Sequence, residues 1–194
     1  FGGLATERLQ LNEGTLWAGG PYDPVNPEAR AALPEARRLI AEGRYKEADA
    51  LLSAKVMARP LHQMPYQTVG DLLLAFPETG APADYRRVLD LDTATASVSY
   101  THEGVRFTRE VFASAPDNVI AVRLTADKPG RISLVASMKT PMAATVTTAG
   151  ADTLVMRGRG GDAAGIKGQL DYEARVKVLA TGGQVSAGAD AVTV

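Results

Sequence analysis

The strongest chemical signal in the sequence lies in residues 7–21, which read ERLQLNEGTLWAGGP. The first part of this stretch alternates polar and apolar residues, which predicts a half-buried strand. Behind that strand come a carboxamide, a carboxylate, an indole and two glycines: Asn12, Glu13, Trp17, Gly19 and Gly20. A rigid aromatic ring among polar groups, with glycines that allow close backbone approach, predicts a surface that contacts a sugar. The alternative is that Trp17, the only tryptophan, packs in the core ahead of a turn.

A second group of candidates surrounds a proline-bounded loop at residues 57–65. His62 lies inside this loop, where its imidazole is a candidate for a polar contact with a ligand. Tyr66 and Gln67 follow the loop directly, and we expect them on the same surface as Trp17.

Metal and nucleophilic chemistry have little support in the sequence. The two histidines, His62 and His102, are far apart, and no carboxylate stands at a ligand-like spacing from either. Cysteine is absent, and no serine occupies a Gly-x-Ser-x-Gly elbow. Glu13 is the only carboxylate whose neighbours resemble a site, and a structural ion pair with an arginine is its alternative role. We therefore predict no metal site and no cofactor.

The composition predicts a globular domain without nucleic-acid or membrane partners. The chain has 194 residues, 45% of them hydrophobic and 22% charged, which suits one domain with a substantial core. The net charge is −1, and the basic residues form no stripe that would attract nucleic acid. Apolar runs stay well short of the roughly 20 residues that span a bilayer.

Two kinds of periodicity divide the chain. Residues 22–65 have helical spacing, with a start at Asn26-Pro27-Glu28 and a stop at Gly43, so we expect a small helical insert at about 27–57. Pro34 is expected to open a second helix, with Leu33, Ala36 and Ile40 on its apolar side, and a third helix is expected from Arg44.

From Tyr66 onward the residues alternate with period two, and turn residues interrupt them. Strands are expected at 118–126 and 131–138 around the turn at 127–130, and His102-Glu103-Gly104 is expected to close a hairpin. The glycine-rich stretch at 157–162 is expected to be a flexible surface loop. The fold class we predict is mainly β, an antiparallel, supersandwich-like β-sandwich with the helical insert.

Several ordered motifs, taken together, resemble glycoside hydrolase family 95, the bacterial and plant α-L-fucosidases. The resemblance rests on the opening stretch and on four further segments, which are 26–48, 66–72, 84–92 and 105–116. It extends in order from Phe1 to about Leu134 and more loosely to Val194.

The resemblance implies that residues 1–194 are the N-terminal β-sandwich of an inverting α-L-fucosidase. In that family the acid and the base lie in a helical (α/α) barrel after the sandwich, so no catalytic residue is expected here, and the chain alone is expected to be inactive. The implied partners are that C-terminal barrel and, through the parent enzyme, a fucose-containing glycan. A chain that starts without methionine and stops within a β-like run fits a piece of a longer protein.

The resemblance also implies a periplasmic or extracellular location. Two alternatives stay open: a free-standing, non-catalytic carbohydrate-binding sandwich, and an α-L-galactosidase of the same family. L-Fucose and L-galactose differ by one hydroxyl at C6, and nothing in the sequence shows which is accepted.

Overall fold

The computed structural model describes residues 1–77 and 80–194 and divides them into two compact units. The first unit contains Phe1–Glu13, Thr68–Gly158 and Glu173–Val194. The second contains Gly14–Gln67 and Arg159–Tyr172.

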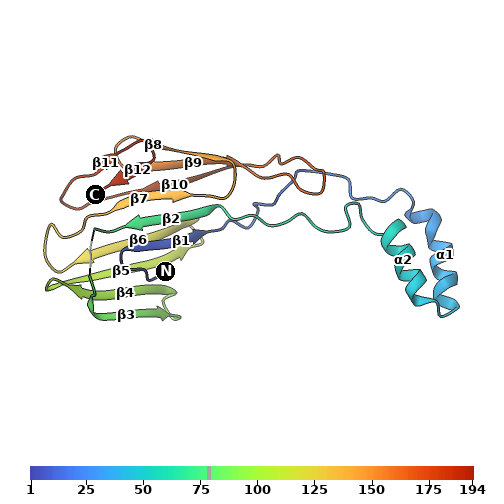
Figure 1. Cartoon of the computed structure of the whole chain (residues 1–194), viewed down its shortest axis with the longest axis horizontal. Helices are drawn as coiled ribbons and strands as arrows, with labels where there is room; N and C mark the ends of the chain where they lie inside the picture. Colours follow the sequence, from blue (N-terminus) through green and yellow to red (C-terminus); the bar gives the residue numbers. More distant parts are fainter. Residues whose placement is uncertain (78–79) are drawn as a thin grey trace. The chain divides into compact units, whose positions relative to one another are not determined.

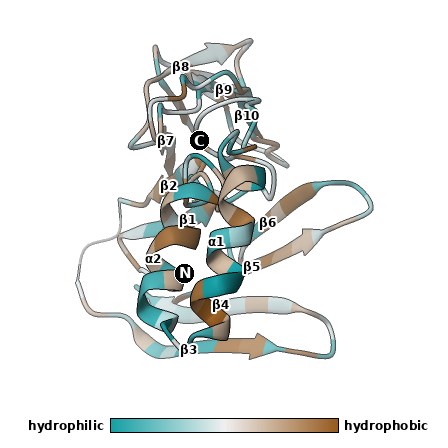
Figure 2. Ribbon diagram, turned by 90° about the vertical axis from the view of Figure 1, so that its right-hand side faces the viewer, coloured by the Kyte–Doolittle hydropathy of each residue, from teal (hydrophilic) through white to brown (hydrophobic). Residues whose placement is uncertain are grey.

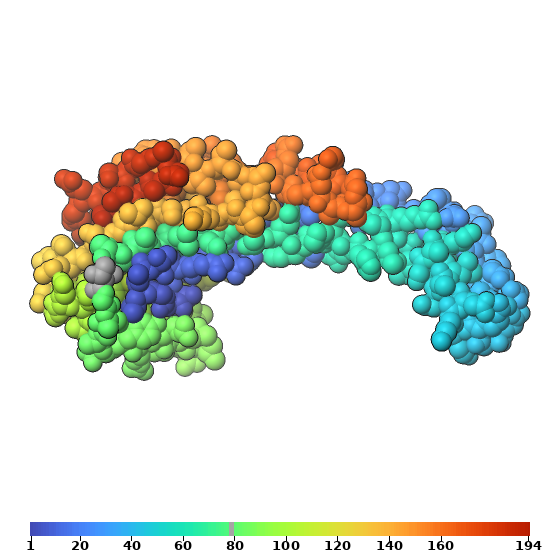
Figure 3. Space-filling view, in the orientation of Figure 1, coloured from blue at the N-terminus to red at the C-terminus, as the bar shows by residue number. Residues whose placement is uncertain are grey.

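A five-stranded antiparallel sheet forms one part of the first unit, in the order β1-β2-β7-β12-β11 (Figure 1). Its strands are β1 (Thr6–Leu11), β2 (Gly70–Ala75), β7 (Val135–Lys139), β11 (Ser186–Ala187) and β12 (Ala191–Thr193). Chain segments that are far apart in sequence, coloured blue, green and gold in Figure 3, lie side by side in it. Leu72 pairs with Leu9 on one side and with Met138 on the other, which fixes the register. The alternation of Leu72 and Leu74 buries both, as their spacing predicts.

A four-stranded antiparallel meander continues the first unit in the order β3-β4-β5-β6. Its strands are β3 (Ala83–Asp90), β4 (Thr95–His102), β5 (Val105–Ser114) and β6 (Val119–Ala126). The predicted hairpin at His102 is confirmed: Glu103 and Gly104 both have positive φ, 48° and 69°, as a two-residue turn of the primed type requires. The inward residues Val98, Tyr100, Val105 and Phe107 form a buried cluster.

A third sheet has the order β10-β9-β8 and comprises β8 (Ala144–Ala149), β9 (Thr153–Arg159) and β10 (Asp171–Lys177). Leu154 and Met156 of β9 are fully buried. Two expectations are corrected here. Residues 131–134 are not part of a strand, so β7 begins only at Val135. The turn at 127–130 connects two different sheets, since β6 pairs with β5 and β7 pairs with β2 and β12. The stretch at 157–162 is not a loop throughout, since β9 runs to Arg159.

The helical insert lies in the second unit and consists of α1 (Ala29–Ala41) and α2 (Tyr45–Lys55), an antiparallel hairpin (Figure 1). Both ribbons mix hydrophobic and hydrophilic segments, as amphipathic helices do (Figure 2). The expected helix stop is confirmed: Gly43 has φ +74°, its N–H bonds Ile40 O, and the Arg44 N–H bonds Leu39 O. This pair of bonds satisfies the last carbonyls of α1.

The expected break at Pro34 is wrong, because Pro34 lies within α1. Pro34 is the sixth residue of α1, where it lacks the N–H of an intrahelical bond, and the helix nevertheless continues to Ala41. The buried side of α1 therefore comprises Ala32, Ala36 and Leu39, whereas Leu33 and Ile40 are exposed. Asn26 is not the cap of α1 but lies two residues before it: its Oδ1 accepts from the N–H of Glu28, the N-cap residue, at 3.1 Å. The predicted fold class, mainly β with antiparallel sheets and a small helical insert, is confirmed.

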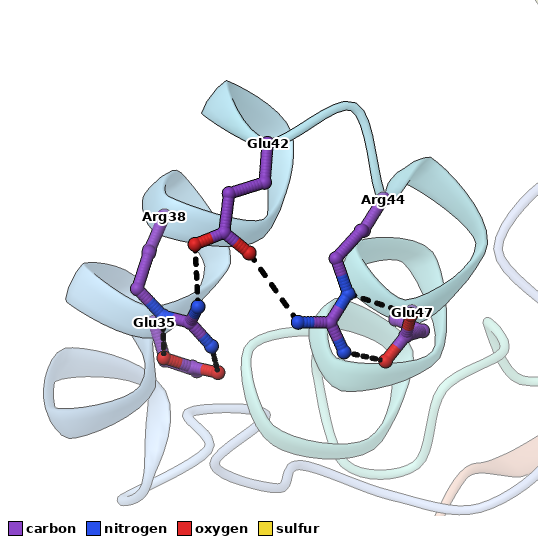
Figure 4. A network of polar contacts seen from close by, with 5 residues as sticks. All are labelled: Glu35, Arg38, Glu42, Arg44 and Glu47. Carbon is purple, nitrogen blue, oxygen red and sulfur yellow. Dashed lines mark hydrogen bonds and ion pairs between the residues drawn. The ribbon is translucent and has the colours of Figure 1, made fainter.

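Charged side chains connect the two helices on their solvent side (Figure 4). Arg38 binds Glu35 at 2.7 Å and Glu42 at 2.6 Å, both within one helical turn. Arg44 continues the chain of contacts to Glu42 at 3.3 Å and to Glu47. All five side chains are at least two-fifths exposed, so this network is a solvated surface feature.

Candidate functional site

Three segments of the second unit converge around Trp17. Backbone bonds connect residues 16–19 to residues 65–67: the Ala18 N–H donates to Pro65 O at 3.0 Å, and the Gln67 N–H donates to Leu16 O at 2.9 Å. Residues 160–170 pair on the other side, where Gly19 N–H donates to Gly161 O at 2.8 Å. The segment after β1 thus becomes the middle of a small hydrogen-bonded arrangement.

Trp17 and Tyr66 form the aromatic part of this arrangement. They face each other as a single antiparallel bridge, and their rings meet edge to face with centroids 5.3 Å apart and an interplanar angle of 73°. The Trp17 indole N–H donates to Gly14 O at 3.1 Å. The ring is held by two contacts, yet 37% of Trp17 remains exposed. Trp17 is therefore not a residue of the sandwich core.

Glycines allow the backbones to approach closely in this region. A Cβ on Gly168 would lie 1.8 Å from Gly160 O, and a Cβ on Gly20 would lie 2.8 Å from the Gln169 side chain. Gly19 has φ +74°, a conformation that residues with a Cβ rarely adopt. The carboxamide of Gln67 accepts from the Gly161 N–H at 3.0 Å, so its role in the structure is to hold the neighbouring segment.

Residues 159–171 form a hairpin-like extension rather than a flexible loop. Arg159 binds Asp171 at 2.6 Å, and the Gly160 N–H donates to Leu170 O at 2.9 Å. At its tip Asp162 accepts from Lys167 Nζ at 2.6 Å and from the Gly168 N–H at 2.9 Å. These two bonds, chiefly the one from Lys167, lower the pKa of the Asp162 carboxyl. The sequence indicated only a flexible loop at 157–162 and not this extension, although the glycine spacing is a signal of close backbone approach.

An open hollow of about 470 Å³ lies beside Trp17. Its lining joins apolar groups to small and amide-bearing residues, which are Thr15, Trp17, Ala18, Gly19, Gly20, Pro21, Met64, Gln169 and Leu170. None of these residues carries a charge. Apolar walls with a few polar groups are typical of sites for small molecules.

The predicted site residues are distributed over both units. Trp17, Gly19 and Gly20 line the hollow, and Tyr66 and Gln67 lie on the neighbouring segment that supports it. His62 is exposed and is not among the residues that line the hollow. Asn12 and Glu13 are exposed and belong to the first unit. A role of these eight residues at a substrate rim stays a prediction.

The chemistry available at the hollow is binding by contact and hydrogen bonding. Its uncharged lining offers no carboxylate for proton transfer. Across residues 1–77 and 80–194, no group of three or more histidine, cysteine or acidic side chains is placed to hold a metal ion. Among the same residues, neither helix has the length and apolar character needed to cross a membrane.

Comparisons with known proteins place the chain in a family. The model of the glycosyl hydrolase family 65 N-terminal domain matches residues 1–194. Alpha-L-fucosidase 2 of Arabidopsis thaliana is 42% identical over 162 residues, which cover 81% of this chain and 19% of that protein. Probable alpha-fucosidase A of Aspergillus niger is 31% identical over 134 residues, 66% of this chain and 16% of that protein.

The chain thus spans about a fifth of the length of these curated relatives. Their names agree with the resemblance to α-L-fucosidases that the sequence motifs indicate, and the match to the domain model covers every residue. The chain therefore belongs to the glycosyl hydrolase family 65 N-terminal domain family.

Proposed function

We propose that this chain is the N-terminal domain of an inverting α-L-fucosidase and serves domain packing and the rim of the substrate pocket. The observation that carries the proposal is the 42% identity, over 81% of the chain, to a protein named alpha-L-fucosidase 2. The acid and the base lie in a helical barrel that follows residue 194. The substrate is a fucose-containing glycan, and the enzyme acts in the periplasm or outside the cell.

The geometry around Trp17 supports the rim role. An indole held by Gly14 and Tyr66 but more than one-third exposed offers its remaining surface to another group. Aromatic rings with a fixed orientation provide contact area at little cost in side-chain entropy. Asn12 and Glu13, at the end of β1, are further rim residues in this proposal, as is His62.

The test has two parts. The coding sequence after Val194 is read, and the activity of residues 1–194 is compared with that of the longer protein. A long helical segment is expected there, and hydrolysis of an aryl α-L-fucoside is expected only when it is present. Turnover by purified residues 1–194 alone would contradict the assignment of acid and base to the barrel. A stop codon directly after Val194 would instead favour a free-standing carbohydrate-binding domain.

The sugar preference is tested in the same assay. An enzyme that accepts the aryl α-L-galactoside better than the fucoside would identify the alternative α-L-galactosidase activity. Because the two sugars differ by one hydroxyl, a polar group near C6 would discriminate strongly and an apolar wall weakly.

A further inference from the structure

We infer that the hollow beside Trp17 is itself a binding site for one neutral pyranose residue of the glycan, with a 6-deoxyhexose as the preferred class. This inference rests on the proposed function for the kind of ligand. It goes beyond that function because the site needs no residue outside the second unit.

Trp17 is held in one orientation beside the hollow. Its N–H donates to the Gly14 carbonyl at 3.1 Å, and its ring meets the Tyr66 ring edge to face with centroids 5.3 Å apart. These two contacts leave 37% of Trp17 exposed, and Trp17 lines the hollow. A pyranose presents C–H groups on one face, and such a face packs against an aromatic ring.

The lining of the hollow combines apolar surface with one amide. Met64, Pro21 and Leu170 supply apolar surface, which suits the methyl group of a 6-deoxyhexose. Gln169 supplies an amide with both donor and acceptor atoms, which suits the hydroxyl groups of a sugar. An uncharged lining gives no advantage to a sugar acid or a phosphate, and this absence of charge favours a neutral ligand.

Contacts with Gly19 and Gly20 position Gln169 at the hollow. Its side chain lies over Gly20, where a Cβ would come within 2.8 Å of Cγ and Cδ, so any larger residue at 20 would displace it. Its backbone N–H is fixed by a bond to Gly19 O at 3.0 Å. The backbone of one segment and the glycine of another thus position the amide at the hollow.

Trp17 is the only tryptophan of the chain, so its fluorescence reports on this site alone. Titration of the 194-residue chain with methyl α-L-fucopyranoside is expected to change the emission in a saturable way. For a ligand of this size, half-saturation is expected on the order of 1 mM or weaker. Methyl β-D-glucuronide is the charged comparison and is expected to bind no better, at low and at high salt.

Two glycine variants form a matched pair. Gly20→Ala displaces Gln169 and is expected to weaken binding about 2- to 10-fold, the value of one hydrogen bond. Gly188→Ala adds the same methyl group in the first unit, where a Cβ would make only an ordinary contact, 3.5 Å from Ala191 O, and is expected to leave binding unchanged. Gln169→Ala provides a second test in which the backbone at residue 20 is untouched.

Unchanged emission with the fucoside would overturn the inference, as would equal binding by Gly20→Ala, Gln169→Ala and the wild type. Tighter, salt-dependent binding of the glucuronide would also overturn it. Each of these results is independent of the hydrolysis assay, so failure of this site and failure of the proposed enzyme function are distinguishable.

Discussion

The guanidinium of Arg109 on β5 lies 3.7 Å from a carboxylate oxygen of Glu7 on β1, and the side chains are only 2% and 1% exposed. Arg109 also donates to Gly3 O at 2.6 Å and to the Tyr100 hydroxyl at 2.8 Å, and its Cζ lies 3.7 Å from the centre of the Phe76 ring. Two buried charges with this many partners connect the five-stranded and four-stranded sheets of the first unit.

Removal of one partner of this pair is expected to be costly. Arg109→Met should lower the free energy of unfolding by about 3–5 kcal/mol, because the buried Glu7 carboxylate would lose the guanidinium and keep only the N-terminal ammonium, at 3.8 Å, as a charged partner. Urea denaturation measures the change. The matched control is Arg123→Met, since Arg123 is 74% exposed and lies 3.8 Å from Glu110; its effect should be about 1 kcal/mol or less. Similar losses in both variants would contradict this account of the buried pair.

A truncation of Trp17 separates a rim role from a packing role in the enzyme that carries the catalytic barrel. Trp17→Ala is expected to lower kcat/KM about tenfold, equivalent to about 1.4 kcal/mol of lost contact. A core tryptophan would instead cost about 3–5 kcal/mol of stability. Tyr45→Ala removes an aromatic ring that is 67% exposed on α2 and serves as the control. A wild-type kcat/KM, corrected for the folded fraction, would rule out the rim role.

The close backbone contact at Gly168 is expected to be essential for the hydrogen-bonded structure of the segment at 160–170. Gly168→Ala would place a Cβ 1.8 Å from Gly160 O, so the two strands of the extension must separate. Hydrogen exchange should then accelerate at the amides of Gly19 and Gln169, which bond within this arrangement. Gly14→Ala adds the same group to open space and should leave these amides protected. Unchanged exchange in Gly168→Ala would show that the close approach is not needed.

The helical hairpin is expected to lose stability in acid. The hydrogen bonds from Arg38 and Arg44 lower the pKa of Glu35 and Glu47 below the ordinary value of 4.5. A carboxyl whose pKa is lower in the folded state stabilises the fold fully above its unfolded pKa, and this contribution is lost as the pH falls through the folded pKa. The helical circular dichroism should therefore be constant above about pH 5 and decrease below pH 4.5.

The control for this acid effect is the double variant Glu35→Gln/Glu47→Gln, in which the part of the decrease that these carboxylates cause should be absent. Added salt should reduce the difference between the variant and the wild type, because all of these groups are exposed to solvent. An identical acid titration in both proteins would exclude these ion pairs as the cause.

Much of the local structure was predictable because its causes lie within a few residues. Gly43 ends α1 because a left-handed residue is needed to satisfy the last carbonyls. Glu103 and Gly104 close a two-residue hairpin, and Leu72 and Leu74 alternate on a half-buried strand. The predicted start of a second helix at Pro34 was wrong, because Pro34 lies inside α1. A rule about single residues does not include the packing of α1 on α2, which stabilises the helix on both sides of the proline.

The candidate site was predictable only in part. The sequence by itself determined the antiparallel β class and the helical insert, because periodicity and turn residues are local properties. The residues at which it places chemistry stay a prediction. The tertiary structure alone decided that Glu7 is buried against Arg109 and that the glycine-rich stretch after Arg159 packs beside Trp17 and Gly19. These contacts join residues more than 100 positions apart, and which backbones meet across such a distance depends on the packing of the whole unit.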